Sequence, residues 1–476
     1  MHTYLVKITS YALGAILLCF GCKSKIYTHR HQFIQKEAPI IDVQKYRSVQ
    51  ERPNQNPDVA IAMAISGGGS RAYNFAMGVL LELDNIYIGQ QRSILNEIDY
   101  FSTVSGGGFA AGSYVSALYE HQTYHPGETF HLKPYYDNRI KKALSKNYTS
   151  PIVGSWVNPV TWFSFLDDGD ALEKSIDKSV LGLKERRKKY GWKSTRSIQL
   201  GDMFIDKNDT TRTATLPFVV ANGTIFRSMD IFPFAPNILD TFQISGYTHY
   251  MRKHNFPEPV DPYTLPLSVG IKASGSFPVA ISNTTLISTY HSEFRFLHII
   301  DGGIADNIGY HTALNMLIRD TVAQRKVLLV VDADGEGIVP TFSRRQRGAM
   351  ALKVYSRLPS SGLDSRHNLF RSELISRCRE HGIIPVFLSF GSLIEQNPDS
   401  PDPIIFKENA QQKMIAQLKL APQAVSGKEL QILYELVTNV QTKYSITPLE
   451  QQLLNLTGKK VVIMKNKEIM AALGVK

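Results

Sequence analysis

Residues 98–115 read IDYFSTVSGGGFAAGSYV and predict a buried strand, a tight turn and a helix in immediate succession. The turn begins at Ser105, directly before the glycines at 106–108. A serine on such a turn projects its Oγ from the edge of a sheet, close to the positive end of the helix dipole. The glycines leave room for an approaching acyl group. We interpret Ser105 as a candidate nucleophile, although Thr103 stands where the pattern G-x-S-x-G has glycine and a glycine-rich turn can be only a turn.

A second glycine-rich turn, SGGGSRA at residues 66–72, follows VAIAMAI at 59–65, a continuous apolar run that suits a central strand. Backbone N–H groups in such a turn can bind one anionic centre. A nucleotide phosphate is one candidate, but the spacings G-x-x-x-x-G-K-[ST] and G-x-G-x-x-G are absent. The other candidate is the oxyanion of a tetrahedral acyl intermediate, with Gly68 and Gly69 as donors. Arg71 then adds positive charge, braces the loop, or serves only as a structural ion-pair partner.

A third predicted strand, FRFLHII at residues 294–300, leads directly into Asp301-Gly302-Gly303. An aspartate at the end of a strand, followed by residues without side chains, has the unobstructed carboxylate that a base facing a serine hydroxyl needs. Aspartate before glycine is also common turn chemistry. We expect residues 306–309, DNIG, to brace this loop through side-chain-to-backbone hydrogen bonds.

The sequence predicts neither a metal nor a cofactor, and it predicts no catalytic histidine. His311, His367 and His381 follow Asp301, as the last member of a triad would, but no motif surrounds any of them. We interpret all of them as ordinary core or surface residues. Residues 167–170, DDGD, lack the remaining ligands of a calcium-binding loop.

The composition indicates a globular protein that favours anionic surroundings. The chain has 476 residues, 43% of them hydrophobic, and a formal net charge of +11. Membrane phospholipid and nucleic acid both fit this charge, but no zinc-type array or aromatic RNA-binding signature accompanies it, so we favour an anionic membrane surface over nucleic acid. The three cysteines, Cys19, Cys22 and Cys378, are too few for a disulfide framework.

The amino-terminal residues predict export to the cell envelope. Residues 11–22, YALGAILLCFGC, are too short to span a bilayer comfortably and suit the apolar part of a signal peptide. Gly21 before Cys22 resembles the end of a bacterial lipoprotein signal, which would make Cys22 a lipidation site. An ordinary signal peptide or an uncleaved anchor is the alternative. The polar residues 23–57 suit a tether from the membrane to the folded part.

Two aromatic and basic segments, at residues 153–165 and 184–193, can be interpreted in two ways. They suit a lipid interface, with aromatic rings at headgroup depth and cations on anionic lipid. They also suit a packed subdomain with a solvated charged face, which is the interpretation we favour. Farther along, residues 326–332 and 383–388 predict strands, the latter near an edge because of Pro385, and apolar residues recur at helical spacing from 430 to 454.

The glycine-rich and acidic motifs together resemble those of the patatin-like phospholipase family. They are GGGSR at 67–71, SGG at 105–107 and DGG at 301–303, in this order and each after a predicted strand, with ASGSFP at 273–278 as a further match. The resemblance implies a three-layer α/β/α sandwich with a central, mostly parallel sheet. It also implies that Ser105 is the nucleophile, that Asp301 is its base in a dyad without histidine, and that Gly67, Gly68 and Gly69 line the oxyanion hole, with Arg71, Gly107, Gly302 and Gly303 in supporting positions. Thr103 and Ala72 depart from the family pattern, which has glycine at both positions.

The resemblance covers residues 58–335 and gives the chain its expected organisation. A signal peptide at 1–22 and the tether at 23–57 precede a catalytic domain at 58–335, which carries an insertion at about 121–213. Residues 336–476 are expected to form an α/β extension that packs on the core. The oligomeric state stays open.

The expected activity is serine-dependent hydrolysis of fatty-acyl esters in phospholipid or lysophospholipid, through an acyl-enzyme. A thioesterase or a serine peptidase could use the same turn. A membrane-associated scaffold that keeps the fold without turnover is the alternative from another class. The features that favour it are Thr103, the basic aromatic segment and the expected lipid anchor.

Overall fold

The computed structural model describes residues 56–88, 92–156, 167–203, 216–247, 261–278, 281–288, 290, 296–333, 371–395 and 409–475. The predicted signal peptide with Cys22, almost all of the predicted tether, and His367 lie outside the described residues.

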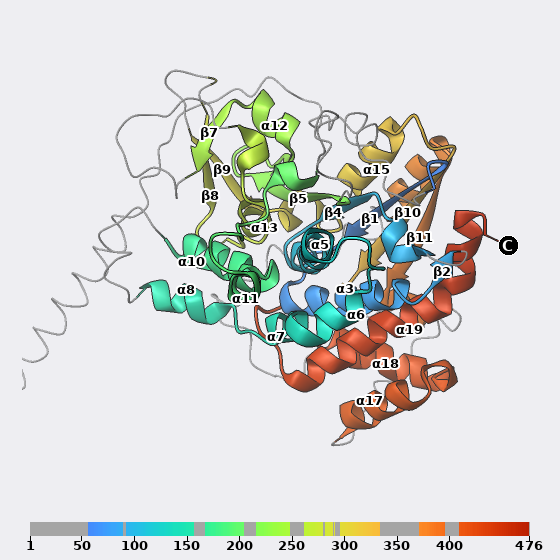
Figure 1. Ribbon diagram of the computed structural model, residues 1–476. Coiled ribbons are helices and arrows are strands. Elements are labelled where there is room, and N and C mark those ends of the chain that lie inside the picture. Colours follow the sequence, from blue (N-terminus) through green and yellow to red (C-terminus); the bar gives the residue numbers. More distant parts are fainter. Residues whose placement is uncertain are drawn as a thin grey trace, which may run out of the picture.

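A single nine-stranded sheet forms the centre of the described residues, and its strand order is β11-β10-β1-β4-β5-β9-β8-β7, with β6 paired to β5 (Figure 1). The neighbours from β11 to β5 are parallel, whereas β9, β8, β7 and β6 pair antiparallel. The strands are β1 (Val59–Ile65), β4 (Tyr100–Thr103), β5 (Phe218–Ile225), β6 (Ile231–Pro233), β7 (Ile244–Tyr247), β8 (Thr284–Ser288), β9 (Phe296–Asp301), β10 (Arg325–Asp332) and β11 (Ile383–Ser389), and a separate ribbon pairs β2 (Tyr87–Ile88) with β3 (Arg92–Ser93).

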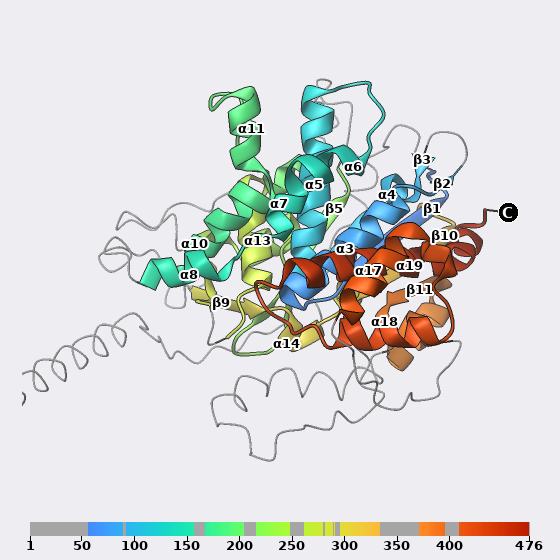
Figure 2. The same cartoon turned by 90° about the horizontal axis from the view of Figure 1, so that it is seen from below.

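Helices cover both faces of the sheet, which makes three layers. On one face α3 (Gly69–Leu83), α5 (Gly106–Tyr124) and α13 (Leu267–Ser274) pack side by side, and α19 (Pro448–Leu473) lies along α3 (Figure 2). On the other face α15 (Tyr310–Arg319) packs on β1, β4 and β10. The expected α/β/α sandwich with a mostly parallel centre is therefore confirmed.

The remaining helices are short and connect or cover the layers. They are α4 (Ile94–Glu97), α6 (Leu132–Tyr135), α7 (Lys141–Leu144), α8 (Thr149–Trp156), α10 (Asp168–Ser175), α11 (Leu183–Tyr190), α12 (Pro236–Thr241), α14 (Gly303–Asp306), α17 (Ala410–Leu420) and α18 (Lys428–Thr438), together with π-helical turns at Tyr136–Ile140 and Ile176–Val180.

The apolar runs of the sequence became the central strands because both faces of the sheet are covered. In β1 all residues from Ala60 to Ile65 are buried, and β10 and β4 flank it on either side. The predicted edge position of residues 383–388 is also confirmed, because β11 ends the sheet and pairs only with β10 among the described strands.

The carboxy-terminal helices join the same core. Helix α19 crosses α3 so closely that a Cβ placed on Gly78 would lie 2.0 Å from the carbonyl oxygen of Asn455. A Cβ on Gly458 would lie 2.2 Å from the carbonyl oxygen of Phe75. Glycine at both positions lets the two backbones touch, and this fixes α19 against the helix that leaves the first glycine-rich turn.

The helical periodicity from 430 to 454 does not correspond to one helix. Helix α18 ends at Thr438, and α19 begins only at Pro448. Thr447 caps α19 in a capping box with Glu450, and Pro448 occupies the first turn, where its missing N–H costs nothing. The intervening residues 439–447 form a loop, which the apolar spacing alone could not show.

The acidic run at 167–170 has a local structural role. Asp167 is the N-cap of α10 and forms a capping box with Asp170. Across the described residues, no cluster of His, Cys, Asp and Glu could hold a metal ion.

The basic segment at 184–193 forms α11 and the turn after it. Tyr190 stacks on Tyr124 with ring centroids 3.6 Å apart, and Arg187 lies over Trp192, which is 74% exposed. Arg186, in contrast, is fully buried and donates to the carbonyl oxygens of Leu181 and Arg196. The segment thus has both a buried residue, Arg186, and an exposed one, Trp192. Its contact with lipid stays a prediction. In the part of the chain that is described, no helix has the length and apolar character needed to cross a bilayer.

Candidate active site

Ser105 lies in a strained turn between β4 and α5. Its φ of 47° and ψ of −116° are unfavourable for a residue with a side chain, and such strain persists only where the surroundings enforce it. The backbone N–H of Ser105 donates to the Oγ of Ser274 at 2.9 Å, which holds the turn against the end of α13. Ser105 is only 9% exposed.

The glycines after Ser105 are required because two backbone turns cross here. A Cβ on Gly106 would lie 2.1 Å from the carbonyl oxygen of Gly69, and one on Gly107 would lie 2.5 Å from that of Ile65. The turn that presents Ser105 therefore rests directly on the β1–α3 loop. This contact brings the first two glycine-rich motifs of the sequence together.

Thr103 fits its position without disturbing the turn. Its side chain is fully buried, and its hydroxyl donates to the carbonyl oxygen of Val220 on the neighbouring strand at 3.2 Å. The threonine hydroxyl, which a glycine would lack, thus forms a hydrogen bond within the sheet.

Asp301 ends β9 and is held by backbone and side-chain contacts. Its N–H donates to the carbonyl oxygen of Ser276 at 3.0 Å, and its own carbonyl accepts from the hydroxyl of Thr224 at 2.8 Å. Its carboxylate accepts from the N–H of Gly303 at 2.8 Å. Burial raises the pKa of Asp301 to about 7, against the opposing effects of this hydrogen bond and of the neighbouring Ser105 side chain.

The pairing register explains how Ser105 and Asp301 meet. Thr103 pairs with Ala221 in the parallel ladder of β4 and β5, and Gly223 pairs with Asp301 in the antiparallel ladder of β5 and β9. Ser105 follows Thr103 by as many residues as Gly223 follows Ala221. Strand β5 thus extends beyond the end of β4, and β9 returns along this extension until Asp301 reaches the level of Ser105.

Gly302 and Gly303 allow the chain to turn in a confined space. A Cβ on Gly302 would lie 2.0 Å from the carbonyl oxygen of Asn222, and one on Gly303 would lie 2.8 Å from the Oδ1 of Asn307. Asp306 braces the next turn as expected: its carboxylate accepts from the N–H groups of Ile308, Gly309 and His311 and contacts the Nδ1 of His311 at 3.1 Å.

In the β1–α3 loop, the prediction that Gly67 serves the oxyanion hole together with Gly68 and Gly69 needs a correction. The N–H of Gly67 donates to the carbonyl oxygen of Asn307 at 2.8 Å, so it does not point at a shared anionic centre. Gly68 and Gly69 adopt φ values of 131° and 56°. Within the described residues, their N–H groups have no hydrogen-bond acceptor, and the two glycines lie next to the Ser105 turn. The candidate oxyanion donors are therefore Gly68 and Gly69, while Gly67 ties the loop to the segment after Asp301.

Arg71 contacts the carboxy-terminal part of the chain. It is buried, and its Nη1 donates to the carbonyl oxygen of Val440 at 3.3 Å. Of the roles considered for this residue, bracing of the loop is the one that this contact supports.

Tyr444 was not predicted as a site residue. Its hydroxyl donates to the carbonyl oxygen of Gly275 at 2.9 Å, and a Cβ on Gly275 would lie only 3.7 Å from the Oγ of Ser105. No motif surrounds Tyr444, so the sequence offered no signal for it. Ser274, which contacts the N–H of Ser105, had a signal, because it belongs to the segment ASGSFP at 273–278.

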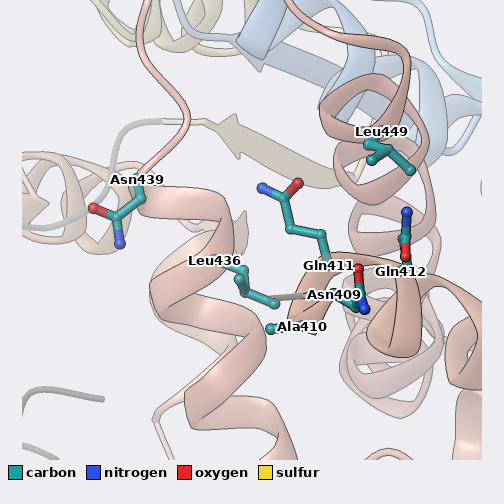
Figure 3. A pocket seen from close by; sticks show the side chains of 7 residues that line it. All are labelled: Asn409, Ala410, Gln411, Gln412, Leu436, Asn439 and Leu449. Carbon is teal, nitrogen blue, oxygen red and sulfur yellow. The ribbon is translucent and has the colours of Figure 1, made fainter. Parts of the chain in front are cut away.

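A separate depression of about 320 Å³ lies among α17, α18 and α19 (Figure 3). None of its lining side chains titrates, and neither Ser105 nor Asp301 is among them; they are Asn409, Ala410, Gln411, Gln412, Leu436, Asn439 and Leu449. This depression is therefore not the site of the predicted acyl chemistry.

Three structures of human GIVD cytosolic phospholipase A2 are similar at TM-scores of 0.44, 0.41 and 0.40 and identities of 11%, 12% and 13%. The second holds methyl gamma-linolenyl fluorophosphonate and terbium chloride, and the third the fluorophosphonate. The matches cover 91%, 91% and 92% of this chain but only 63%, 61% and 64% of the human chains, so the chain spans less than two thirds of their length. No curated protein matches.

A family model described as patatin-like phospholipase matches residues 63–314, which include both Ser105 and Asp301. The matched region is more than half of the 476-residue chain. The chain therefore belongs to the patatin-like phospholipase family.

Proposed function

We propose that this protein is a serine lipid acyl hydrolase that uses Ser105 as nucleophile and Asp301 as its base. The observation that carries the proposal is the placement of the Ser105 side chain beside a buried carboxylate whose pKa is raised to about 7. A base with a pKa near the working pH is ionised often enough to accept a proton and is basic enough to do so readily. No histidine is needed for this step.

In the first half of the reaction, Asp301 accepts the hydroxyl proton of Ser105 while the Oγ attacks the ester carbonyl carbon. The carbonyl electron pair moves to oxygen, and the resulting oxyanion is stabilised by the N–H groups of Gly68 and Gly69 and by the amino-terminal end of α5. When the tetrahedral intermediate collapses, the alcohol leaves with the proton from Asp301. The fatty acid is then esterified to Ser105.

In the second half, Asp301 accepts a proton from water, and the hydroxide attacks the acyl-enzyme carbonyl carbon. The second tetrahedral oxyanion is held by the same amides. Its collapse releases the fatty acid, and Ser105 regains its proton from Asp301. Each half therefore uses one base and one pair of donors, and Asp301 and the amides of Gly68 and Gly69 are our candidates for these roles.

The substrate class follows from the family and the charge. Phospholipid or lysophospholipid in an anionic membrane suits a chain with a net charge of +11. We further propose export through residues 1–22, with Cys22 as the lipidation site. Mass spectrometry of the membrane-associated protein would test the modification, which Cys22→Ser should abolish.

The experiment measures fatty-acid release from mixed phospholipid vesicles by the full-length protein. Ser105→Ala and Asp301→Asn should each abolish release. The matched control is Ser145→Ala, because Ser145 is exposed and bonds only Lys141 and Gln451 among described residues. Unchanged release by folded Ser105→Ala would overturn the proposal.

Two further readouts separate the alternatives. Parallel assays with ester, thioester and peptide substrates distinguish a lipase from a thioesterase or a peptidase that uses the same turn. Labelling with a fluorophosphonate reports whether Ser105 is nucleophilic at all. A folded wild-type protein that neither labels nor releases fatty acid would be a scaffold, contrary to the proposal.

A further inference from the structure

The loop at residues 439–447, which we name the Tyr444 segment, runs from α18 to α19 and contacts two parts of the proposed active site. The family match ends at residue 314, so this segment lies outside the matched region. It belongs to the part of the chain for which the sequence indicated no function.

One end of the Tyr444 segment is bound to the β1–α3 loop. The carbonyl oxygen of Lys443 accepts from the N–H of Ser70 at 2.7 Å, and that of Val440 accepts from Arg71. A Cβ on Gly69 would lie 2.5 Å from the Lys443 carbonyl oxygen. The backbone of the segment therefore touches the loop that carries the proposed oxyanion donors.

The next residue, Tyr444, is bound beside Ser105 through its side chain. The phenol hydroxyl donates to the carbonyl oxygen of Gly275, and Gly275 adjoins the Oγ of Ser105. Burial, and next the negative charge of Asp301, raise the pKa of Tyr444, so the phenol stays protonated and remains a donor.

Together, the backbone at Lys443 and the side chain of Tyr444 link the β1–α3 loop at Gly69 to Gly275, which adjoins Ser105. We call this link the strap. A site bridged in this way leaves less room for a bulky ester than an open one. We propose that Tyr444 is a specificity-determining residue that holds the strap closed, so that single-chain acyl esters such as lysophospholipid are hydrolysed in preference to two-chain phospholipid. This inference rests on the proposed function and names its substrate class.

The test compares kcat/KM for lysophospholipid and for diacyl phospholipid of the same headgroup, both dispersed in detergent micelles. Tyr444→Phe removes only the hydroxyl, and Tyr444→Ala also removes the ring. The matched control is Tyr434→Phe, on α18 of the same extension. Wild type should prefer lysophospholipid. Loss of one hydrogen bond should raise the diacyl-to-lyso ratio by about fivefold in Tyr444→Phe, mainly through KM for the diacyl substrate, and by more in Tyr444→Ala.

A second measurement works without catalysis. In a Ser105→Cys background, the full-length protein is treated with a small and with a long-chain methanethiosulfonate, and the rate of the Ser105 parent is subtracted to remove the other thiols. Tyr444→Ala should accelerate the long-chain reagent at least fivefold more than the small one.

The outcomes distinguish the two proposals. If wild type hydrolyses lysophospholipid and Ser105→Ala does not, the proposed function stands, and an unchanged diacyl-to-lyso ratio in folded Tyr444→Phe and Tyr444→Ala would overturn the role of Tyr444. If wild type hydrolyses neither lipid, the proposed function fails, and the preference inferred for Tyr444 fails with it. Equal acceleration of both thiol reagents would show that the strap does not select by size.

Discussion

The side chain of Ser105 lies beside the carboxylate of Asp301, although β4, which precedes Ser105, and β9, which ends at Asp301, run in opposite directions. The pair meets because β5 is parallel to one and antiparallel to the other. Ser105 is presented from a strained turn, and Asp301 is buried to the point that its pKa lies near 7. Both features cost stability, and the proposed chemistry explains why they are kept.

The pH dependence of kcat/KM should show one ionisation near pH 7, with activity falling as the pH decreases below it. The reason is that Asp301 must be ionised to accept the Ser105 proton, and burial raises the pKa of Asp301 to about 7. Well below this pH, kcat/KM should fall about tenfold per pH unit. Initial rates on a micellar ester between pH 5 and 9 provide the measurement.

Glu173 is the control for this profile. Burial raises the pKa of Glu173 also to about 7, and its carboxylate accepts from the hydroxyl of Ser268 at 3.1 Å. Glu173→Gln should leave the ionisation in place. If the ionisation disappeared in Glu173→Gln, the titrating group would be Glu173, and our assignment of it to Asp301 would be wrong.

Asp301→Asn should be more stable than wild type at pH 8 although it is inactive. The folded-state pKa of Asp301 is raised from 3.8 to about 7, so its contribution to stability is fully present below about pH 4 and is lost as the pH rises through 7. Asparagine does not ionise, so Asp301→Asn does not lose stability in this way as the pH rises. Its advantage should grow between pH 4 and 8 and reach at most roughly 4 kcal/mol.

Urea unfolding of both proteins at several pH values checks this expectation. The stability difference between Asp301→Asn and wild type must increase with pH, whatever its value at pH 4. A difference that is constant across this range would show that the buried carboxylate carries no ionisation penalty.

Gly69→Ala should lower activity by about tenfold or more. A Cβ at this position would lie 2.5 Å from the carbonyl oxygen of Lys443, and the φ of 56° is strained for alanine. The loop must shift to relieve the contact, which displaces the amides of Gly68 and Gly69 from the oxyanion. The strain should cost roughly 1–2 kcal/mol of stability. Ester hydrolysis and thermal unfolding are the measurements.

Gly154→Ala is the matched substitution for Gly69→Ala. Gly154 lies on α8, and a Cβ there would meet no atom within 4 Å. This variant should keep full activity and be at least as stable as wild type, because alanine favours a helix. Equal activity of the two variants would argue against Gly68 and Gly69 as oxyanion donors.

Thr103→Gly restores the residue usual in the family and should nevertheless destabilise this protein by about 1–2 kcal/mol. The change removes the hydrogen bond to Val220 and places glycine inside a strand. Activity should stay within about threefold of wild type, because the Ser105 turn is held by Ser274 and by the glycines after it. A large gain in activity would mean that Thr103 had impaired the turn.

The local patterns were sufficient for the elements that carry the site. Residues 59–65 were recognisable as a central strand from their unbroken apolar run, and the turns at Ser105 and Asp301 from glycines after apolar segments. These features depend on neighbours in the chain, so the sequence contains them. The loop at 439–447 was not recognisable, because apolar spacing continues across it and its ends are set by the caps of two separate helices.

The hydrogen bond of the Gly67 amide could not be predicted for a different reason, because its acceptor is distant in the sequence. All three glycines at 67–69 look equivalent in the sequence, yet the N–H of Gly67 is occupied by the carbonyl oxygen of Asn307, which lies 240 positions later. Tyr444 is similar, since its hydroxyl donates to the carbonyl oxygen of Gly275, which lies 169 positions earlier. Long-range contacts of this kind leave no local trace.

By itself, the sequence determined which residues could react: a serine and an aspartate on tight turns, and a glycine-rich loop able to donate amides. Only the tertiary structure decided how they meet, because the antiparallel return of β9 along the projecting end of β5 sets the level of Asp301. The tertiary structure also set the pKa of Asp301, since burial depends on every element packed around it. Chemical type is a property of the residue, whereas distance and solvation are properties of the fold.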